Sequence, residues 1–331
     1  MKIVTLYSLY NNPKGGKGEN TLIYTITLNP AIDLVIVTKK LEPKVVNRTE
    51  RFELQPNGKG VNVSFILKKL NIDSIATGIG GGFTLDYVTS GLEDSGIKAN
   101  FYKVDEPTRV NVFTNVIDQN TEYKEVNPGP IISQAVQEKF LNYLDSSVHK
   151  NDMIVISGSF SRGIEPNFLV KIAQIAEKNT VKLVIDCSYL AVLDTLKFHP
   201  FLLKPNDDEL ATFFNYHGEM TQEKIIELAQ RLISLGCQNV LVSLGAQGAA
   251  LVNENTVLYA NAPKIKLVNS ACAGDTMLGT FIGLLSKGKS AKEALKTAVA
   301  AGSDTASRLG LTNFELDELL PQITVREGKN E

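Results

Sequence analysis

The chain has 331 residues, of which 43% are apolar and 21% charged, and its formal net charge is −2. These values are typical of a globular protein with a large core, in one large domain or two small ones. The charge balance argues against a nucleic-acid-binding surface, and no apolar run approaches the ~20 residues of a membrane span. Three widely spaced cysteines and three histidines argue against a zinc site and a Ser/His triad, and the cysteine usage indicates a reducing compartment, the cytoplasm.

Residues 1–22 are expected to be a leader or linker outside the fold. Met1–Tyr10 lacks the long apolar core and the small-residue cleavage site of a signal peptide. Residues 11–20 are rich in Gly, Lys and Asn, which is typical of a linker. The Gly-Gly-Lys-Gly run at 15–18 is interpreted as a decoy, because no periodic helix follows it.

The next part of the chain is rich in predicted strands. We expect strands at 23–28, 34–37, 45–54, 109–117 and 122–127. Residues 57–60 open a helix whose apolar positions 63, 66, 67 and 70 fall on one face. The stretches at about 32–54 and 99–127 do not fit a parallel sheet, so they predict one small separate sheet, a candidate lid.

From about residue 133 helices alternate with short apolar strands. The predicted helices are 133–147, 166–178 and 221–235, and the strands are 153–157, 182–186 and 240–244. This alternation predicts a mostly parallel sheet covered by helices on both faces, an α/β fold. Ligands of such sheets bind beyond the carboxyl ends of the strands. Four segments fall at such ends: Ser157, Asp186, Lys204-Pro205-Asn206 and Ser243-Leu244-Gly245.

Several loops could bind anions or cations, and each has a simpler interpretation. Asn57-Gly58-Lys59-Gly60 suits an anion at a helix N-terminus or is a solvated turn. Asn206 and Glu209 could hold a hydrated Mg²⁺, or they form a helix cap. Ser243–Gly248 is either a nucleotide-binding loop or a plain hairpin. The glycines of 78–82 permit close approach to a ligand, or mark a flexible turn.

Two charged side chains and one cysteine are also candidates. Arg109, on the expected lid, has a fork-shaped guanidinium suited to a phosphate, although a lone Arg is usually a surface charge. Asp33 follows a Pro-containing turn and could accept hydrogen bonds from sugar hydroxyls, or serve the turn itself. Cys272 is interpreted as a small packed residue rather than a nucleophile, because no histidine is near it in sequence.

Ala273-Gly274-Asp275 is the most informative segment. The spacing of Met277, Phe281, Leu284 and Leu285 predicts a helix that starts at this tripeptide. Such a start aims unpaired backbone N–H groups and the positive dipole end at one point, which suits the migrating group of a phosphoryl transfer. Asp275 would be a carboxylate beside that point, able to take a proton from a hydroxyl. The alternative is that these residues have no catalytic role, because Gly and Asp are common at the starts of helices.

These motifs, in this order, resemble the ribokinase-like (PfkB) family of sugar kinases over about residues 23–325. The motifs that carry the resemblance are residues 27–33, 58–63, 157–159, Lys204-Pro205-Asn206 with Glu209, 243–248 and 273–276. The resemblance implies a three-layer α/β/α sandwich with a mostly parallel sheet plus a lid, which commonly pairs with a second subunit. Two positions depart from the family's pattern: Asn57, where a small residue is frequent, and Cys272, where glycine is usual.

The resemblance also implies roles for individual residues. Asp275 would be the catalytic base, and Ala273 and Gly274 would contribute the anion hole. The substrate residues would be Asp33, Gly58, Lys59, Asn62, Arg109 and Asn111, with Lys59 and Arg109 on the existing phosphate. The nucleotide residues would be Lys204, Ser243, Gly245 and Gly248. Asn206 and Glu209 would organise Mg²⁺, with ATP as phosphate donor.

Within the family, residues 27–33 and 108–112 most resemble the 1-phosphofructokinases. The expected reaction is phosphorylation of fructose 1-phosphate to the 1,6-bisphosphate, in a cytoplasmic enzyme that forms a homodimer through the lid. A tagatose-6-phosphate kinase is the nearest alternative, and a non-catalytic sensor of sugar phosphate or nucleotide is an alternative of another class. A dinucleotide-dependent dehydrogenase is disfavoured, because no Gly-x-Gly-x-x-Gly opens a helix after the first strand.

Overall fold

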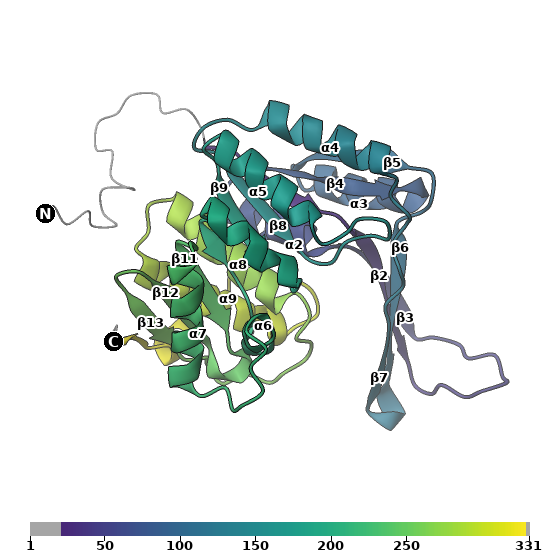
Figure 1. Ribbon diagram of the computed structural model, residues 1–331. Coiled ribbons are helices and arrows are strands. Elements are labelled where there is room, and N and C mark those ends of the chain that lie inside the picture. The colour runs from purple at the N-terminus through teal and green to yellow at the C-terminus, as the bar shows by residue number, and fades with distance from the viewer. Residues whose placement is uncertain (1–20, 329–331) are drawn as a thin grey trace, which may run out of the picture.

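A computed structural model describes residues 21–328, which form a large sheet between two helical layers and a smaller sheet that projects from them (Figure 1). The predicted leader lies almost wholly outside the described residues. Leu22, just before the first strand, already belongs to the body, since its N–H donates to the Asp152 carboxylate at 2.9 Å. The three-layer α/β/α architecture with an added small sheet is as predicted.

The large sheet has ten strands in the order β14-β13-β12-β11-β10-β9-β8-β1-β4-β5. In chain order they are β1 Ile23–Thr27, β4 Ser74–Gly81, β5 Lys98–Val104, β8 Met153–Ser157, β9 Lys182–Asp186, β10 Leu202–Leu203, β11 Asn239–Ser243, β12 Ala249–Asn253, β13 Val257–Ala260 and β14 Val325–Gly328. The strands β11, β10, β9, β8, β1, β4 and β5 pair in parallel. Strands β12, β13 and β14 extend the sheet beyond β11 with antiparallel pairing.

Helices cover both faces of this sheet because its central strands are apolar on both sides. The helices are α2 Lys59–Lys69, α3 Gly82–Asp94, α4 Gln134–Ser147, α5 Phe168–Lys178, α6 Asp207–Phe213, α7 Gln222–Ser234, α8 Ala273–Ser286 and α9 Ala291–Ala306. In β8, Ile154 and Ile156 pack in the core with α4, α5 and α7, whereas Met153 and Val155 pack with α2, α8 and α9. This alternation follows the two-residue period of a strand.

The smaller sheet, here called the lid, has the order β3-β2-β6-β7. Its strands are β2 Ala31–Thr38, β3 Arg51–Asn57, β6 Arg109–Val116 and β7 Thr121–Glu125. Strands β2 and β6 pair in parallel, so the lid is not wholly antiparallel. It carries side chains from two excursions of the chain into the space beside the carboxyl ends of the central strands.

The lid is shorter in sequence than expected. Residues 98–104 form β5, which pairs in parallel with β4 at the edge of the large sheet, so the second excursion contributes only from Arg109 onward. The exposed and half-buried positions of β5 make it look like a lid strand in sequence. The large sheet likewise continues to Gly328 through β14, three residues beyond the expected boundary at 325.

The glycines at 78–82 do not form a flexible turn. They end strand β4 and open α3. A β-carbon at Gly78 would lie 1.9 Å from the backbone oxygen of Thr27, and one at Gly81 would lie 2.0 Å from that of Val104. Glycine is therefore required because the neighbouring strands approach too closely for any side chain.

Candidate active site

The predicted site residues converge at the carboxyl ends of β8, β9, β10 and β11, as expected for a parallel sheet. Ser157 and Asp186 are the last residues of β8 and β9 and stand opposite each other in register. Asn206, just after β10, forms a bridge with Ser243 at the end of β11. The start of α8 and the start of α2 complete the site, and these two helices pack against each other.

Helix α8 begins at Ala273, as predicted, and its first turn presents free donors. Cys272, the residue before it, has φ 63°, in the left-handed region that favours glycine, so a non-glycine residue is strained at this position. Within the described residues the backbone N–H groups of Gly274 and Asp275 donate no hydrogen bond. Both groups and the positive end of the helix dipole therefore remain available to an anion.

Asp275 is held in this turn by Asn62 of α2, whose Nδ2 donates to its carboxylate at 2.8 Å. Only 5% of Asp275 is exposed, and burial raises the pKa of its carboxyl group to about 6. The neighbouring ammonium of Lys59 opposes this shift. The result is a carboxylate that is ionised at neutral pH and far more basic than an exposed one.

Asp186 binds two lysines at the centre of the site. Its carboxylate lies 3.3 Å from Nζ of Lys59 and 3.1 Å from Nζ of Lys204. Burial alone would raise the pKa of Asp186, but the two ammonium groups hold it below its ordinary value. Although burial alone would lower the pKa of Lys59, the charges of Asp186 and Asp275 hold it above its ordinary value. A β-carbon on Gly274 would lie 3.4 Å from Nζ of Lys204, so this cation borders the start of α8.

The position of Asp186 at a strand end is visible in the sequence, but no role for it follows from the sequence alone. Its two partners are 127 and 18 residues away, so only the folded arrangement reveals the cluster. A carboxylate directly after the apolar run Leu183–Ile185 was the available signal. One oxygen of Asp186 is buried and has no hydrogen-bond partner among the described residues.

A cavity of about 240 Å³ lies beside this cluster. It is lined by Thr27, Asn29, Lys59, Arg109, Ser157, Gly158, Ser159 and Ser188. Arg109 reaches it from the lid, anchored by hydrogen bonds of 3.3 Å from its guanidinium to the carbonyls of Asn29 and Asn127. Its Nε is buried without a partner among the described residues. Two cations and four hydroxyl side chains around one small cavity suit a phosphate group.

The lid also supplies Asp33, which is buried beside the start of α2. Asn111, its register partner on β6, donates to one carboxylate oxygen at 2.8 Å, and Asn57 donates to the other. Burial raises the pKa of Asp33. Gly58, which precedes α2, has φ 137°, and a β-carbon there would lie 2.6 Å from the Thr27 side chain. The structure thus brings all six predicted substrate residues to one region.

Asn206 and Glu209 form the helix cap that was one of the two predicted alternatives. The Glu209 N–H donates to Asn206 Oδ1 at 2.7 Å, and the Asn206 N–H donates to Glu209 Oε2 at 3.0 Å. Oε1 of Glu209 accepts no hydrogen bond within the described part of the chain. The cap therefore leaves one carboxylate oxygen available, and Mg²⁺ needs few protein ligands because it keeps several waters.

The segment 243–248 is a tight connection between the antiparallel strands β11 and β12, so the hairpin interpretation is confirmed. Gly248 has φ 105°, and a β-carbon there would lie 1.9 Å from the carbonyl oxygen of Ala260. Gly245 has φ 53° and faces open space. Ser243 lies beside Asn206 through the bridge between their backbones, so the hairpin and the cap form one border of the site.

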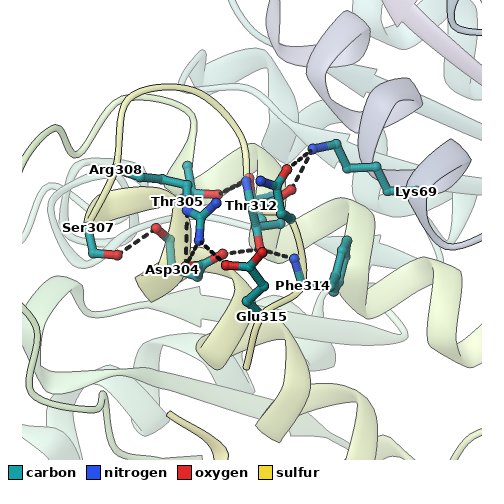
Figure 2. Close-up of polar contacts among 10 residues, drawn as sticks. Lys69, Asp304, Thr305, Ser307, Arg308, Thr312, Phe314 and Glu315 are labelled. Carbon is teal, nitrogen blue, oxygen red and sulfur yellow. Dashed lines mark hydrogen bonds and ion pairs between the residues drawn. The ribbon is translucent and has the colours of Figure 1, made fainter. Parts of the chain in front are cut away.

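A polar network joins the ends of α2 and α9 to residues 312–315 (Figure 2), and a hydroxyl contact connects it to the first turn of α8. The hydroxyl of Thr276 lies 2.9 Å from that of Thr305 on α9, and Thr305 also accepts from the backbone of Thr312 at 2.9 Å. Thr312 donates to the Asp304 carboxylate at 2.5 Å, and its carbonyl accepts from Lys69 of α2 at 2.7 Å. The ends of α2 and α9 thereby support the residue next to Asp275.

The arrangement has the parts needed to transfer an anionic group. A basic carboxylate can take a proton from a hydroxyl, and free backbone donors at a helix start can stabilise the charge of the moving group. Among the described residues no three His, Cys, Asp or Glu side chains gather into a metal cluster. No helix in residues 21–328 is long and apolar enough to cross a membrane.

Comparison with known proteins supports the same chemistry. The pattern of the pfkB family carbohydrate kinases matches residues 21–318. A D-tagatose-1-phosphate kinase from Bacillus licheniformis is 41% identical over 305 residues, 92% of this chain and 99% of the relative. A 1-phosphofructokinase from Bacillus subtilis is 34% identical over 307 residues, with the same coverage. The crystal structure of Escherichia coli phosphofructokinase-2 with fructose-6-phosphate aligns with a TM-score of 0.83 at 26% identity, over 91% of this chain and 98% of that one.

Proposed function

Because the chain belongs to the pfkB family of carbohydrate kinases, we propose that it transfers the γ-phosphoryl group of ATP to the 6-hydroxyl of a ketohexose 1-phosphate. Fructose 1-phosphate and its C4 epimer tagatose 1-phosphate are the two candidate substrates, and each would yield the 1,6-bisphosphate. The names of both Bacillus relatives refer to phosphate at the 1-position of the sugar. This supports the 1-phosphates over tagatose 6-phosphate, the substrate of the alternative kinase named in the sequence analysis.

The observation that carries the proposal is the position of Asp275, between the Asn62 amide and the free N–H groups of α8. Asp275 accepts the proton of the sugar's 6-hydroxyl while the oxygen of that hydroxyl attacks the γ-phosphorus. The bond from the γ-phosphorus to the bridging oxygen breaks, and ADP leaves. The backbone N–H groups of Gly274 and Asp275 stabilise the charge on the transferring group. This machinery also argues against the non-catalytic sensor.

The substrate's own phosphate would occupy the cavity of about 240 Å³ between Lys59 and Arg109. The ammonium of Lys59 and the guanidinium of Arg109 neutralise its charge, and the serines around the cavity supply further donors. Asp33, Asn62 and Asn111 would bind the sugar hydroxyls from the opposite side. A sugar held at both ends presents its 6-hydroxyl in one orientation, which favours attack.

ATP would lie along the border made by the cap at Asn206 and the hairpin 243–248, with Lys204 toward its phosphates. Asn206 and the free oxygen of Glu209 would hold Mg²⁺ through its waters, and the buried unpaired oxygen of Asp186 adds to this donor set. Bound Mg²⁺ would neutralise charge on the phosphates. Gly245 faces open space, so the nucleotide can approach the backbone there.

An ADP-release assay tests the function directly. The panel contains fructose 1-phosphate, tagatose 1-phosphate, fructose 6-phosphate and tagatose 6-phosphate, each with Mg-ATP. We expect kcat/KM to be highest for one of the 1-phosphates. A preference for a 6-phosphate would disprove the proposed acceptor, and absence of turnover with binding retained would favour the sensor.

Arg109→Ala should raise the KM for the sugar 1-phosphate by roughly tenfold to a hundredfold, because a charge-assisted contact to phosphate is worth about 1.5–3 kcal/mol. The KM for ATP should stay within about twofold. The unphosphorylated sugar provides the control, since its weak turnover lacks this contact. If phosphorylated and unphosphorylated sugars are affected equally, the assigned phosphate contact is wrong.

We also propose that the protein forms a homodimer through the lid and works in the cytoplasm. The lid exposes large apolar side chains, with Phe52 66% and Tyr123 46% exposed, and such surface is costly to leave in water. Phe52→Glu should shift the protein from dimer to monomer in sedimentation velocity. A wild-type protein that sediments as a monomer at micromolar concentration would contradict the dimer.

A further inference from the structure

A continuous row of hydrogen bonds connects the lid to the first turn of α8. Asn111 donates to Asp33 at 2.8 Å, and Asn57 donates to the second oxygen of the same carboxylate. Asn62 donates to Asn57 Oδ1 at 2.9 Å and to Asp275 at 2.8 Å. The row therefore joins the carboxylate assigned to the sugar with the carboxylate assigned as the base, through two amide side chains.

Asn57 occupies the middle of this row, and both ends of its amide are engaged. Its Oδ1 accepts from the Gly58 N–H at 2.5 Å as well as from Asn62. Its Nδ2 points to Asp33, with Cys272 Sγ at 3.9 Å. Since the Oδ1 side is fixed by two donors, the Nδ2 side has one orientation, and the Gly58 N–H and the Asn62 side chain together direct it toward Asp33.

The side chain also borders space that a ligand can enter. Asn57 is half-buried and lines a cavity of about 280 Å³ together with Asp33, Asn62 and Cys272. Asp33, by contrast, is buried, and each of its oxygens accepts one amide hydrogen. A carboxylate has about four lone-pair positions, so two remain, and their directions are set by Asn57 and Asn111.

We propose that Asn57 is a specificity-determining residue, which fixes the Asp33 carboxylate so that it accepts ring hydroxyls in only one configuration. This inference rests on the proposed function. Fructose 1-phosphate and tagatose 1-phosphate differ only in the direction of the 4-hydroxyl. A carboxylate held from both sides cannot turn toward a 4-hydroxyl that points in the other direction. Binding of that epimer therefore leaves a buried polar group unpaired. Without Asn57, Asp33 can rotate and accept either epimer.

The test compares kcat/KM for the two epimers in the wild-type protein and in Asn57→Ala. We expect the preference of the wild type for one epimer to fall by about tenfold, the equivalent of one lost hydrogen bond, mainly through KM. Asn57→Asp keeps the side-chain shape but removes the donor toward Asp33, so it should lose the preference as well. Asn115→Ala is the control, because Asn115 is on lid strand β6 and its side chain makes no hydrogen bond in residues 21–328.

A purely structural role would lower kcat/KM for both epimers by the same factor, and that result would overturn the inference. A wild-type protein without any preference between the epimers would overturn it too. If the protein instead phosphorylates 6-phosphates, the proposed function fails, and the same ratio measured on fructose 6-phosphate and tagatose 6-phosphate still decides the role of Asn57. Inactivity on all four sugars would overturn both proposals.

Discussion

Asp275→Asn should lower kcat by about 10²- to 10⁴-fold while leaving the KM for the sugar phosphate within a few fold. The substitution keeps the side-chain shape, and its oxygen can still accept the hydrogen bond from Asn62. Only the ability to take a proton is lost. Steady-state kinetics with the preferred sugar 1-phosphate measure the effect. Glu223→Gln, another acidic residue in the first turn of a helix, is the control and should change kcat little.

The same substitution should remove the pH dependence of turnover. A base must be deprotonated, so wild-type kcat should rise with pH through about 6, the pKa of Asp275, and level off above it. The residual activity of the asparagine variant should show no inflection there. Near-wild-type kcat in the variant would remove Asp275 as the base.

As pH rises, the stability of the wild-type protein should fall while its activity rises. Because the folded pKa of Asp275 lies above the ordinary value of 3.8, the folded protein binds the extra proton between about pH 3.8 and 6. The contribution of this group to the free energy of unfolding therefore falls as pH rises through that window. Above it, the buried charge costs on the order of 3 kcal/mol. Asp275→Asn should consequently have an equal or higher Tm than the wild type at pH 7.5.

Asp186→Asn should have the largest effect on stability. It leaves Lys204, only 5% exposed, and Lys59 without their shared carboxylate. Breaking a buried ion pair by removing one partner costs about 3–5 kcal/mol, because a charge stays buried without compensation. Urea unfolding should show a loss of this size. Activity should fall with it, because both ammonium groups border the site.

Asp145→Asn provides the matched control, since it breaks the exposed pair with Lys178. Exposed pairs contribute about 0–1 kcal/mol, so this variant should unfold almost as the wild type does. Adding Lys204→Met to Asp186→Asn should recover part of the lost stability by removing one unpaired buried charge. A loss below 1 kcal/mol for Asp186→Asn would mean that water reaches the cluster and screens it.

Local patterns predicted most of the helices and strands described here, but not the helices α3 and α9. Helix α8 was predicted from the spacing of its apolar residues, and its start at Ala273 is confirmed. The contact of Gly78 and Gly81 with neighbouring strands was not predicted, because those strands are distant in sequence. Strand β5 was wrongly predicted to belong to the lid, because an edge strand of the large sheet has the same polar pattern as a lid strand. The polar and apolar pattern of a segment predicts a helix or a strand, but it does not predict which sheet a strand joins.

The site was predicted through resemblance more than through spacing. Asn62 and Asp275 are 213 residues apart, and no local rule places them 2.8 Å from each other. The role of Asp186 was missed because the ion-pair cluster exists only after two strand ends, those of β9 and β10, and the start of α2 meet. The linking role of Asn57 was not predicted, since its four hydrogen-bond partners include residues on β2, α2 and the turn before α8.

The central place of β1 in the large sheet also determines when the chain can fold during synthesis. This strand is the first of the described strands to be made, yet its two neighbours are β4, which starts at Ser74, and β8, which starts at Met153. At 5–20 residues per second, the ribosome needs roughly 7–25 s to supply the second neighbour. During that time an apolar strand has one edge unpaired, which exposes it to aggregation. The nascent chain, more than the finished enzyme, is therefore where we expect a chaperone to be needed.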